Sequence, residues 1–268
     1  MTTTLTLAKG SHVANEESIL CSTGLDARGS DRGSWMVCAE GDSTVRYHEG
    51  EAFDWISFGA ETALLERNSV ILIPNLVTQE ECGQLTRGVE RAHADTKPEG
   101  ADLDGDEGME RYMVSELCGQ TQSIFNDIFR ERLLPFIHTR LPSHIEDNIW
   151  ALSMIFDRED RAPLCEQRFK FSSQEPAINR YSKFGAFEPH RDALAVTLNV
   201  LLSDGFEGGG TQFWQEGIDD LDCGRGPALC LLPSAGVGVV FNGTVKHAGR
   251  EVVSGTRHLL VASFSVAR

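Results

Sequence analysis

The sequence predicts an α+β protein in which helices precede a β-sandwich or open barrel. A capping box and a segment with apolar residues at helical spacing predict two helices in the first half. From Ile149 onward, short apolar runs alternate with glycine-rich turns, which is typical of many short strands joined by tight turns. The chain has 268 residues, 41% of them hydrophobic, which is enough for one sizeable core, and it shows no internal repeat.

The first half is expected to hold one strand and two helices. The β-branched run Ser69–Ile73 predicts a strand. Thr78 and Glu81 then fit a capping box, so a helix is expected to begin there and to end near Ala94. A second helix is expected at Thr121–Arg132, where isoleucines and phenylalanines recur at helical spacing.

Later strands are expected at Trp150–Phe156, Ala177–Tyr181, Leu194–Leu202, Thr211–Trp214, Ala228–Leu232, Gly238–Phe241 and His258–Ser265. The chain is therefore divided into three segments. Residues 1–50 lack a sustained period and are expected to form an N-terminal extension, partly disordered or acting as a lid. Residues 51–148 form a helical support region with the first strand, and residues 149–268 form the core that carries the site.

The charge balance argues against two classes of partner. The chain has 24 basic and 40 acidic residues, a net charge of −16, which would repel nucleic acid and anionic membranes. Seven cysteines without a C-x-x-C motif argue against a disulfide framework and indicate a reducing compartment. With no expected signal peptide and no long apolar run, we predict an intracellular, cytoplasmic protein, while organelle targeting stays open. The oligomeric state is not determined.

His190 and Asp192 form the first candidate metal-binding pair. A spacing of two along an extended chain places both side chains on one face. His247, which follows an apolar run and a turn at Asn242-Gly243, is the candidate third ligand. Two histidines and one carboxylate occupy one face of an octahedron and suit Fe(II), whereas a structural Zn²⁺ site takes four protein ligands. The alternative is three ordinary residues of a β-domain, because H-x-D alone arises often by chance.

Arg257 strengthens the metal hypothesis. It follows His247 after a turn at Ser254-Gly255 that leads into a strand. Adjacent antiparallel strands would bring it back near that histidine. A guanidinium binds a carboxylate through two parallel hydrogen bonds, which is what the distal carboxylate of 2-oxoglutarate needs. A lone arginine is otherwise more often a surface charge.

Four stretches resemble one enzyme family. Residues 179–192, NRYSKFGAFEPHRD, look like the R-Y-x-x-G-x-x-x-x-P-H-x-D signature of prolyl 4-hydroxylase-like oxygenases. Residues 206–213 resemble the family's F-x-G-G-x-T-x-F segment, and residues 246–257 its H-x-G-x-x-V-x-x-G-x-R ending. Residues 70–82 resemble the family's opening strand and helix. The resemblance covers residues 69–268, with the motifs in order.

The resemblance implies a double-stranded β-helix (jelly-roll) core with N-terminal supporting helices. It implies an Fe(II)- and 2-oxoglutarate-dependent dioxygenase that uses O₂ as co-substrate and releases succinate and CO₂. The reaction would be hydroxylation of an unactivated C–H bond, or oxidative cyclisation or desaturation. The expected metal ligands and catalytic residues are His190, Asp192 and His247. The expected cofactor-binding residues are Arg257, Tyr181, Asn199 and Thr211.

The substrate is expected to be a small molecule. Basic residues flank the ligands in an otherwise acidic protein and favour a carboxylate-bearing, amino-acid-type substrate. The expected contacts are Lys183, Arg180, Arg250 and Trp214. Because Trp214 and Phe213 would also suit an extended peptide, a prolyl 4-hydroxylase acting on peptidyl proline is the first alternative. A non-catalytic β-barrel binding module is the second, since fold does not fix function.

Overall fold

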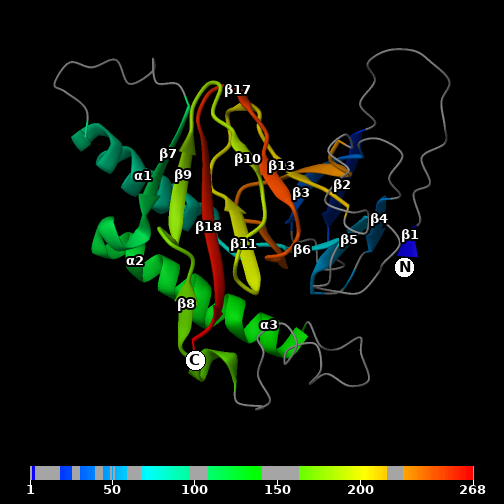
Figure 1. Ribbon diagram of the computed structural model, residues 1–268, viewed down its shortest axis with the longest axis horizontal. Helices are drawn as coiled ribbons and strands as arrows, with labels where there is room; N and C mark the ends of the chain where they lie inside the picture. Colours follow the sequence, from blue (N-terminus) through cyan, green and yellow to red (C-terminus); the bar gives the residue numbers. More distant parts are fainter. Residues whose placement is uncertain are drawn as a thin grey trace.

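Two antiparallel sheets hold most of the described strands, and helices cover one face of the larger sheet (Figure 1). The structure is a computed structural model that describes residues 2–3, 19–25, 31–39, 45–48, 50, 52–58, 68–96, 108–140, 163–215 and 226–267. No helix within these ranges is long and apolar enough to cross a membrane.

The larger sheet has ten strands and continuous apolar strands at its centre. Its order is β1 (Thr2–Thr3), β4 (Val45–His48), β5 (Asp54–Phe58), β6 (Ser69–Ile73), β15 (Gly238–Asn242), β11 (Val196–Leu201), β18 (Arg257–Val266), β9 (Ala177–Tyr181) and β7 (Met109–Met113), with β8 (Phe169–Phe171) beside β18. Strands β6, β9 and β11 are buried at every position, because both of their faces are covered.

The smaller sheet faces the side of the larger one that the helices do not cover. Its order is β10 (Phe187–His190), β16 (His247–Gly249), β13 (Thr211–Phe213), β14 (Leu229–Pro233), β3 (Asp31–Ala39) and β2 (Ile19–Leu25). A separate pair joins β12 (Glu207–Gly208) to β17 (Val252–Ser254). Apart from the β12–β17 pair, the chain alternates between the two sheets from β9 to β18, except at the β13–β14 hairpin, which stays within the smaller sheet.

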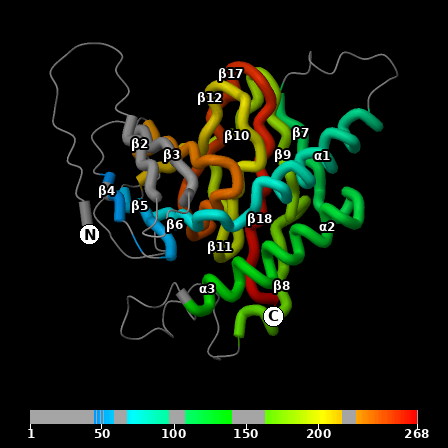
Figure 2. The backbone as a smooth tube through the Cα atoms, turned by 180° about the vertical axis from the view of Figure 1, so that it is seen from behind, coloured from blue at the N-terminus to red at the C-terminus, as the bar shows by residue number. Residues whose placement is uncertain are grey.

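The helices pack on the outer face of the larger sheet (Figure 2). They are α1 (Gln79–Thr96), α2 (Gly119–Asn126), the π-helical segment η2 (Asp127–Leu133) and α3 (Leu134–Arg140), with single 3₁₀ turns η1 (Val114–Glu116) and η4 (Leu164–Glu166). Leu85 of α1 and Phe129 of η2 belong to the same apolar cluster as Leu198 of β11 and Leu260 of β18. A second cluster, which includes Phe213 and Phe241, fills the space between the sheets.

The sequence predicted most of these elements. The strands at Ser69–Ile73 and Ala177–Tyr181 have the expected bounds, and both helices form. The second helix is longer than expected, because η2 and α3 continue it through Pro135 to Arg140. The strand expected at Trp150–Phe156 lies outside the described residues. The chain is thus an α+β protein rich in sheet.

Strands lie within the segment that was expected to form an N-terminal extension. Strand β3 pairs with β14, β2 pairs with β3, and β4 pairs with β5, so the described parts of residues 1–50 extend both sheets. Backbone hydrogen bonds build such strands without requiring a strong apolar period, which is why the sequence pattern did not reveal them. Strands from all three expected segments share the two sheets.

The start of α1 is fixed by a predicted capping box that also binds a second helix. The Thr78 backbone N–H donates to Glu81 Oε2 over 2.9 Å, and Arg132 of η2 donates to both carboxylate oxygens over 2.8 and 2.5 Å. The Arg132 hydrogen bonds are the main reason that the pKa of Glu81 falls from 4.5 to about 2. Glu81 therefore joins the helix cap to the packing of α1 against η2.

The Glu81→Gln substitution should lower the free energy of unfolding at pH 7 by about 1–2 kcal/mol, because it weakens both the cap and a charge-assisted pair. The folded-state pKa lies below the unfolded value, so this stabilisation is present above pH 4.5 and is lost as pH falls towards 2. Urea unfolding across this range should show the two proteins converging. The exposed Glu80→Gln control should change stability by less than about 0.5 kcal/mol. A constant difference down to pH 2 would contradict the assignment.

Candidate metal centre

The three predicted ligands meet at the edge of the smaller sheet. His190 on β10 lies opposite His247 on β16 in the strand register, and Asp192 follows His190 by two residues. The Nε2 atom of His190 lies 3.6 Å from Asp192 Oδ1, and that of His247 lies 3.7 Å from Asp192 Oδ2. One ligand atom from each residue lies within 4.8 Å of the other two. Within the described ranges this is the one cluster of its kind.

Backbone hydrogen bonds orient both imidazoles for metal binding. His190 Nδ1 lies 2.8 Å from the Glu188 carbonyl oxygen, and His247 Nδ1 lies 3.0 Å from that of Val245. Because a carbonyl can only accept, each Nδ1 carries the hydrogen, and the Nε2 lone pairs face Asp192. Burial is the main reason that the pKa of His247 is lowered, with the Asp192 carboxylate opposing the shift. A neutral imidazole is the form that binds metal.

Asp192 is held by the turn that precedes His247. Its backbone N–H donates to the Gly243 carbonyl over 2.8 Å. A Cβ at Gly243 would lie 2.0 Å from the Leu194 carbonyl oxygen, so no larger residue fits this approach. The Thr197 hydroxyl on β11 donates to Asp192 Oδ2. The predicted Asn242-Gly243 turn thus brings the two parts of the ligand set together.

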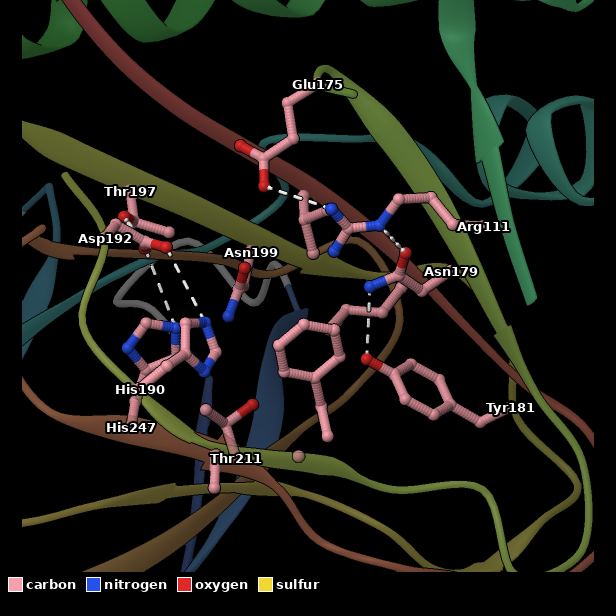
Figure 3. Close-up of a pocket in the computed structure, with 15 residues that line it drawn as sticks. Arg111, Glu175, Asn179, Tyr181, His190, Asp192, Thr197, Asn199, Thr211 and His247 are labelled. Atoms are coloured by element: carbon pink, nitrogen blue, oxygen red, sulfur yellow. Dashed lines mark hydrogen bonds and ion pairs between the residues drawn. The ribbon is translucent and has the colours of Figure 1, made fainter. Parts of the chain in front are cut away.

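A cavity between the two sheets leads to these ligands (Figure 3). Tyr181 on β9 and Asn199 on β11 come from the larger sheet, and Thr211 on β13 comes from the smaller one. All three were predicted as cofactor-binding residues. The full lining is Arg111, Glu175, Asn179, Tyr181, Phe187, His190, Asp192, Thr197, Asn199, Thr211, His247, Ala248, Gly249, Leu259 and Val261.

Arg257 lies buried behind the cavity wall, with 1% of its surface exposed. Its guanidinium lies 5.1 Å from the centre of the Tyr181 ring, and its Nη2 lies 3.5 Å from Thr211 Oγ1. Its Nε and Nη1 have no hydrogen-bond partner among the described residues, and burial lowers its pKa. An unpaired buried charge is costly, so a bound anion would supply what the site lacks.

The glycine-rich turn before β13 makes room for this arginine. Gly209 has a φ of +67°, and a Cβ there would lie 3.1 Å from Arg257 Cδ. A side chain at this position would strain the backbone and crowd the guanidinium. The predicted turn at residues 206–213 therefore supports Arg257 as well as Thr211.

The four predicted substrate contacts do not line the cavity. Arg180 faces the opposite side of β9, where its Nε donates to Glu90 over 3.0 Å, because neighbouring strand residues alternate between faces. Lys183 is exposed, with its ammonium 4.8 Å from the Phe184 ring centre. Trp214 instead contacts the Lys246 ammonium, and Arg250 is half-buried outside the lining. None of the four therefore lines this cavity, and their part in substrate binding stays a prediction.

The sequence also missed several lining residues. Asn179 and Thr197 stand two residues from Tyr181 and Asn199, so alternation along a strand could have found them. Arg111 lies on β7, a strand that the sequence did not reveal, and Glu175 precedes β9 by two residues. No local pattern links this arginine to this glutamate.

Comparisons with known proteins give a consistent but distant likeness. No protein-family model matches the chain, and no curated protein matches it. Three solved structures illustrate the matches among structures. An oxidoreductase of the 2OG-Fe(II) oxygenase family from Burkholderia pseudomallei is 18% identical, with 73% of this chain and 84% of that chain covered and a TM-score of 0.41.

A prolyl-4-hydroxylase from Pseudomonas putida is 14% identical, with 74% of this chain and 93% of that chain covered and a TM-score of 0.45. HygX from Streptomyces hygroscopicus, solved with nickel and 2-oxoglutarate bound, is 14% identical, with 74% and 83% covered and a TM-score of 0.45. With identities of 18% or less and TM-scores of 0.45 or less, the geometry of the site itself carries the functional argument.

Mn²⁺ titrations should test the metal centre directly. His190→Ala should abolish binding, because it removes a ligand. Thr197→Val should weaken binding by about 10- to 100-fold, because it removes a hydrogen bond that orients Asp192. Thr139→Val, on the exposed part of α3, is the matched control and should bind as the wild type does. Unchanged affinity in His190→Ala would rule out this centre.

Proposed function

We propose that this chain is an Fe(II)- and 2-oxoglutarate-dependent oxygenase with a double-stranded β-helix (jelly-roll) core. The observation that carries the proposal is a face of two histidines and one carboxylate beside a buried arginine with unpartnered nitrogens. The alternation of strands from β9 to β18 between two sheets supports the jelly-roll. The donor set suits Fe(II) and leaves open positions for a 2-oxo acid and O₂.

His190, Asp192 and His247 would hold the iron, which would supply the reduction of O₂ that the side chains cannot perform. In the proposed reaction, R–H, 2-oxoglutarate and O₂ give R–OH, succinate and CO₂. Cyclisation or desaturation of the substrate would replace R–OH by the product that has lost two hydrogens, and one water would form. The chain's own contribution is to bind, orient and shield the reactants.

Arg257 would bind the distal carboxylate of 2-oxoglutarate. The Tyr181 ring and the Thr211 hydroxyl both contact its guanidinium and both residues line the cavity, so a carboxylate at this end would meet a buried positive charge beside a hydroxyl. Asn199 adds an amide on the same side of β11 as Thr197. Leu259 and Val261 supply an apolar wall that limits water near the reacting groups.

Succinate release measured with Fe(II), 2-oxoglutarate and O₂ tests this function. We expect slow release without substrate, none after chelation, and none from His190→Ala or His247→Ala. A panel of free amino acids and proline-rich peptides then identifies the class of substrate. A protein that binds both cofactors but never releases succinate would be the non-catalytic module. Trp214 lies outside the cavity lining, which removes one support for the peptidyl-proline alternative.

Arg257→Met should weaken the binding free energy of 2-oxoglutarate by about 2–5 kcal/mol. The dissociation constant should therefore rise roughly 30-fold to several thousand-fold. Because methionine removes a buried charge without a partner, the ligand-free variant should be as stable as the wild type or more so. Calorimetric titration of the Mn²⁺-loaded protein measures the first effect, and urea unfolding the second. Unchanged 2-oxoglutarate affinity would show that another residue binds this carboxylate.

A further inference from the structure

One charged wall of the cavity contains neither a candidate metal ligand nor Arg257. It consists of Arg111, Glu175 and Asn179, which Figure 3 shows together, on the other side of the cavity from the histidines. Arg111 Nε donates to Asn179 Oδ1 over 2.9 Å. Asn179 Nδ2 donates in turn to the Tyr181 hydroxyl over 3.1 Å. Hydrogen bonding therefore holds the Arg111 guanidinium through its Nε only.

The opposite charges of this wall are only loosely paired. Arg111 Nη1 lies 3.7 Å from Glu175 Oε1, which is too long for a hydrogen bond. Among the described residues, neither Nη atom of Arg111 has a hydrogen-bond acceptor. Glu175 Oε2 accepts the backbone N–H of Ser263 over 2.5 Å, while Oε1 has no such donor. The Nη donors of Arg111 and the Oε1 acceptor of Glu175 therefore lie side by side and can each form further hydrogen bonds.

This wall is also largely removed from water. The side chain of Arg111 is 22% exposed and that of Glu175 is 10% exposed. Burial is the main reason that the pKa of Glu175 is raised; Asp192 adds to the shift and Arg111 opposes it. A cationic ligand group would therefore be well placed to stabilise the Glu175 carboxylate.

We propose that this wall binds the amino and carboxylate groups of a free amino-acid substrate. The Nη atoms of Arg111 would bind the substrate carboxylate, and Glu175 Oε1 would bind its ammonium group. A zwitterion brings no net charge to a wall whose own charges cancel, whereas a simple anion or cation would leave one buried charge unmatched. This inference rests on the proposed function and names the substrate class for the same site.

The position of the wall also indicates which part of the substrate is oxidised. The Arg111 guanidinium lies 5.5 Å from the centre of the Phe187 ring, and that ring lies 4.7 Å from the His190 ring. The Phe187 ring thus contacts both Arg111 of the wall and the metal ligand His190. An amino acid held at the wall would direct its side chain along Phe187, so a side-chain carbon, not the α-carbon, would meet the oxidant.

Binding to the anaerobic protein loaded with Mn²⁺ and 2-oxoglutarate tests the proposal without turnover. The probes are the free L-amino acids, the N-acetyl and carboxamide derivatives of the tightest binder, and a Pro-Pro-Gly repeat peptide. Each derivative should bind at least about tenfold more weakly than the free amino acid, since it loses a charge-assisted contact. Glu175→Gln should abolish the penalty for N-acetylation only, and Arg111→Gln the penalty for the carboxamide only.

Exposed Lys170→Gln and Glu166→Gln are the matched charge controls and should preserve both penalties. Retained Mn²⁺ and 2-oxoglutarate binding will show that the Arg111 and Glu175 variants are folded. The proposal is overturned if capped derivatives or the peptide bind as tightly as the free amino acid, if no amino acid binds, or if each variant weakens all probes equally. Amino-acid binding without succinate release would instead contradict the proposed function alone.

Discussion

The site depends on the alternation of side chains across the larger sheet. On β11, Leu198 and Val200 face the helices, while Thr197 and Asn199 face the cavity. On β18, Leu260 packs against the helices and Leu259 lines the cavity. A slip of one residue would exchange these faces and place polar groups in the apolar core, so helix packing and site geometry are fixed together.

The same alternation gives neighbouring arginines opposite roles. Arg257 faces the cavity side. Arg180 on β9 lies opposite His258, the next residue of β18, and faces α1. There Arg180 and His258 both bind Glu90, with the His258 contact at 2.6 Å, and the pKa of Glu90 falls to about 2 mainly because of that histidine. This outer network joins α1 to the sheet, so its charged groups stabilise the fold and do not bind a ligand.

On the cavity side, in contrast, the polar groups are only partly satisfied by hydrogen bonds to one another. The imidazoles and Asp192 are oriented by backbone carbonyls and Thr197, which leaves the metal-facing atoms free to bind. Arg257 lacks partners at two nitrogens. Buried groups left in this state lower stability, and their retention together at one end of a cavity is what a ligand-binding site requires.

The sequence by itself determined the parts of the site that are local. The spacing of His190 and Asp192 reflects the period of a strand, and the order of the apolar runs predicted the central strands. The residues Arg111 and Glu175 became neighbours only in the tertiary structure, because β7 pairs with β9 across a long sequence separation. Which face each residue occupies was likewise decided by strand register, since a composition of basic residues near the ligands says nothing about the side of the sheet on which each charge lies.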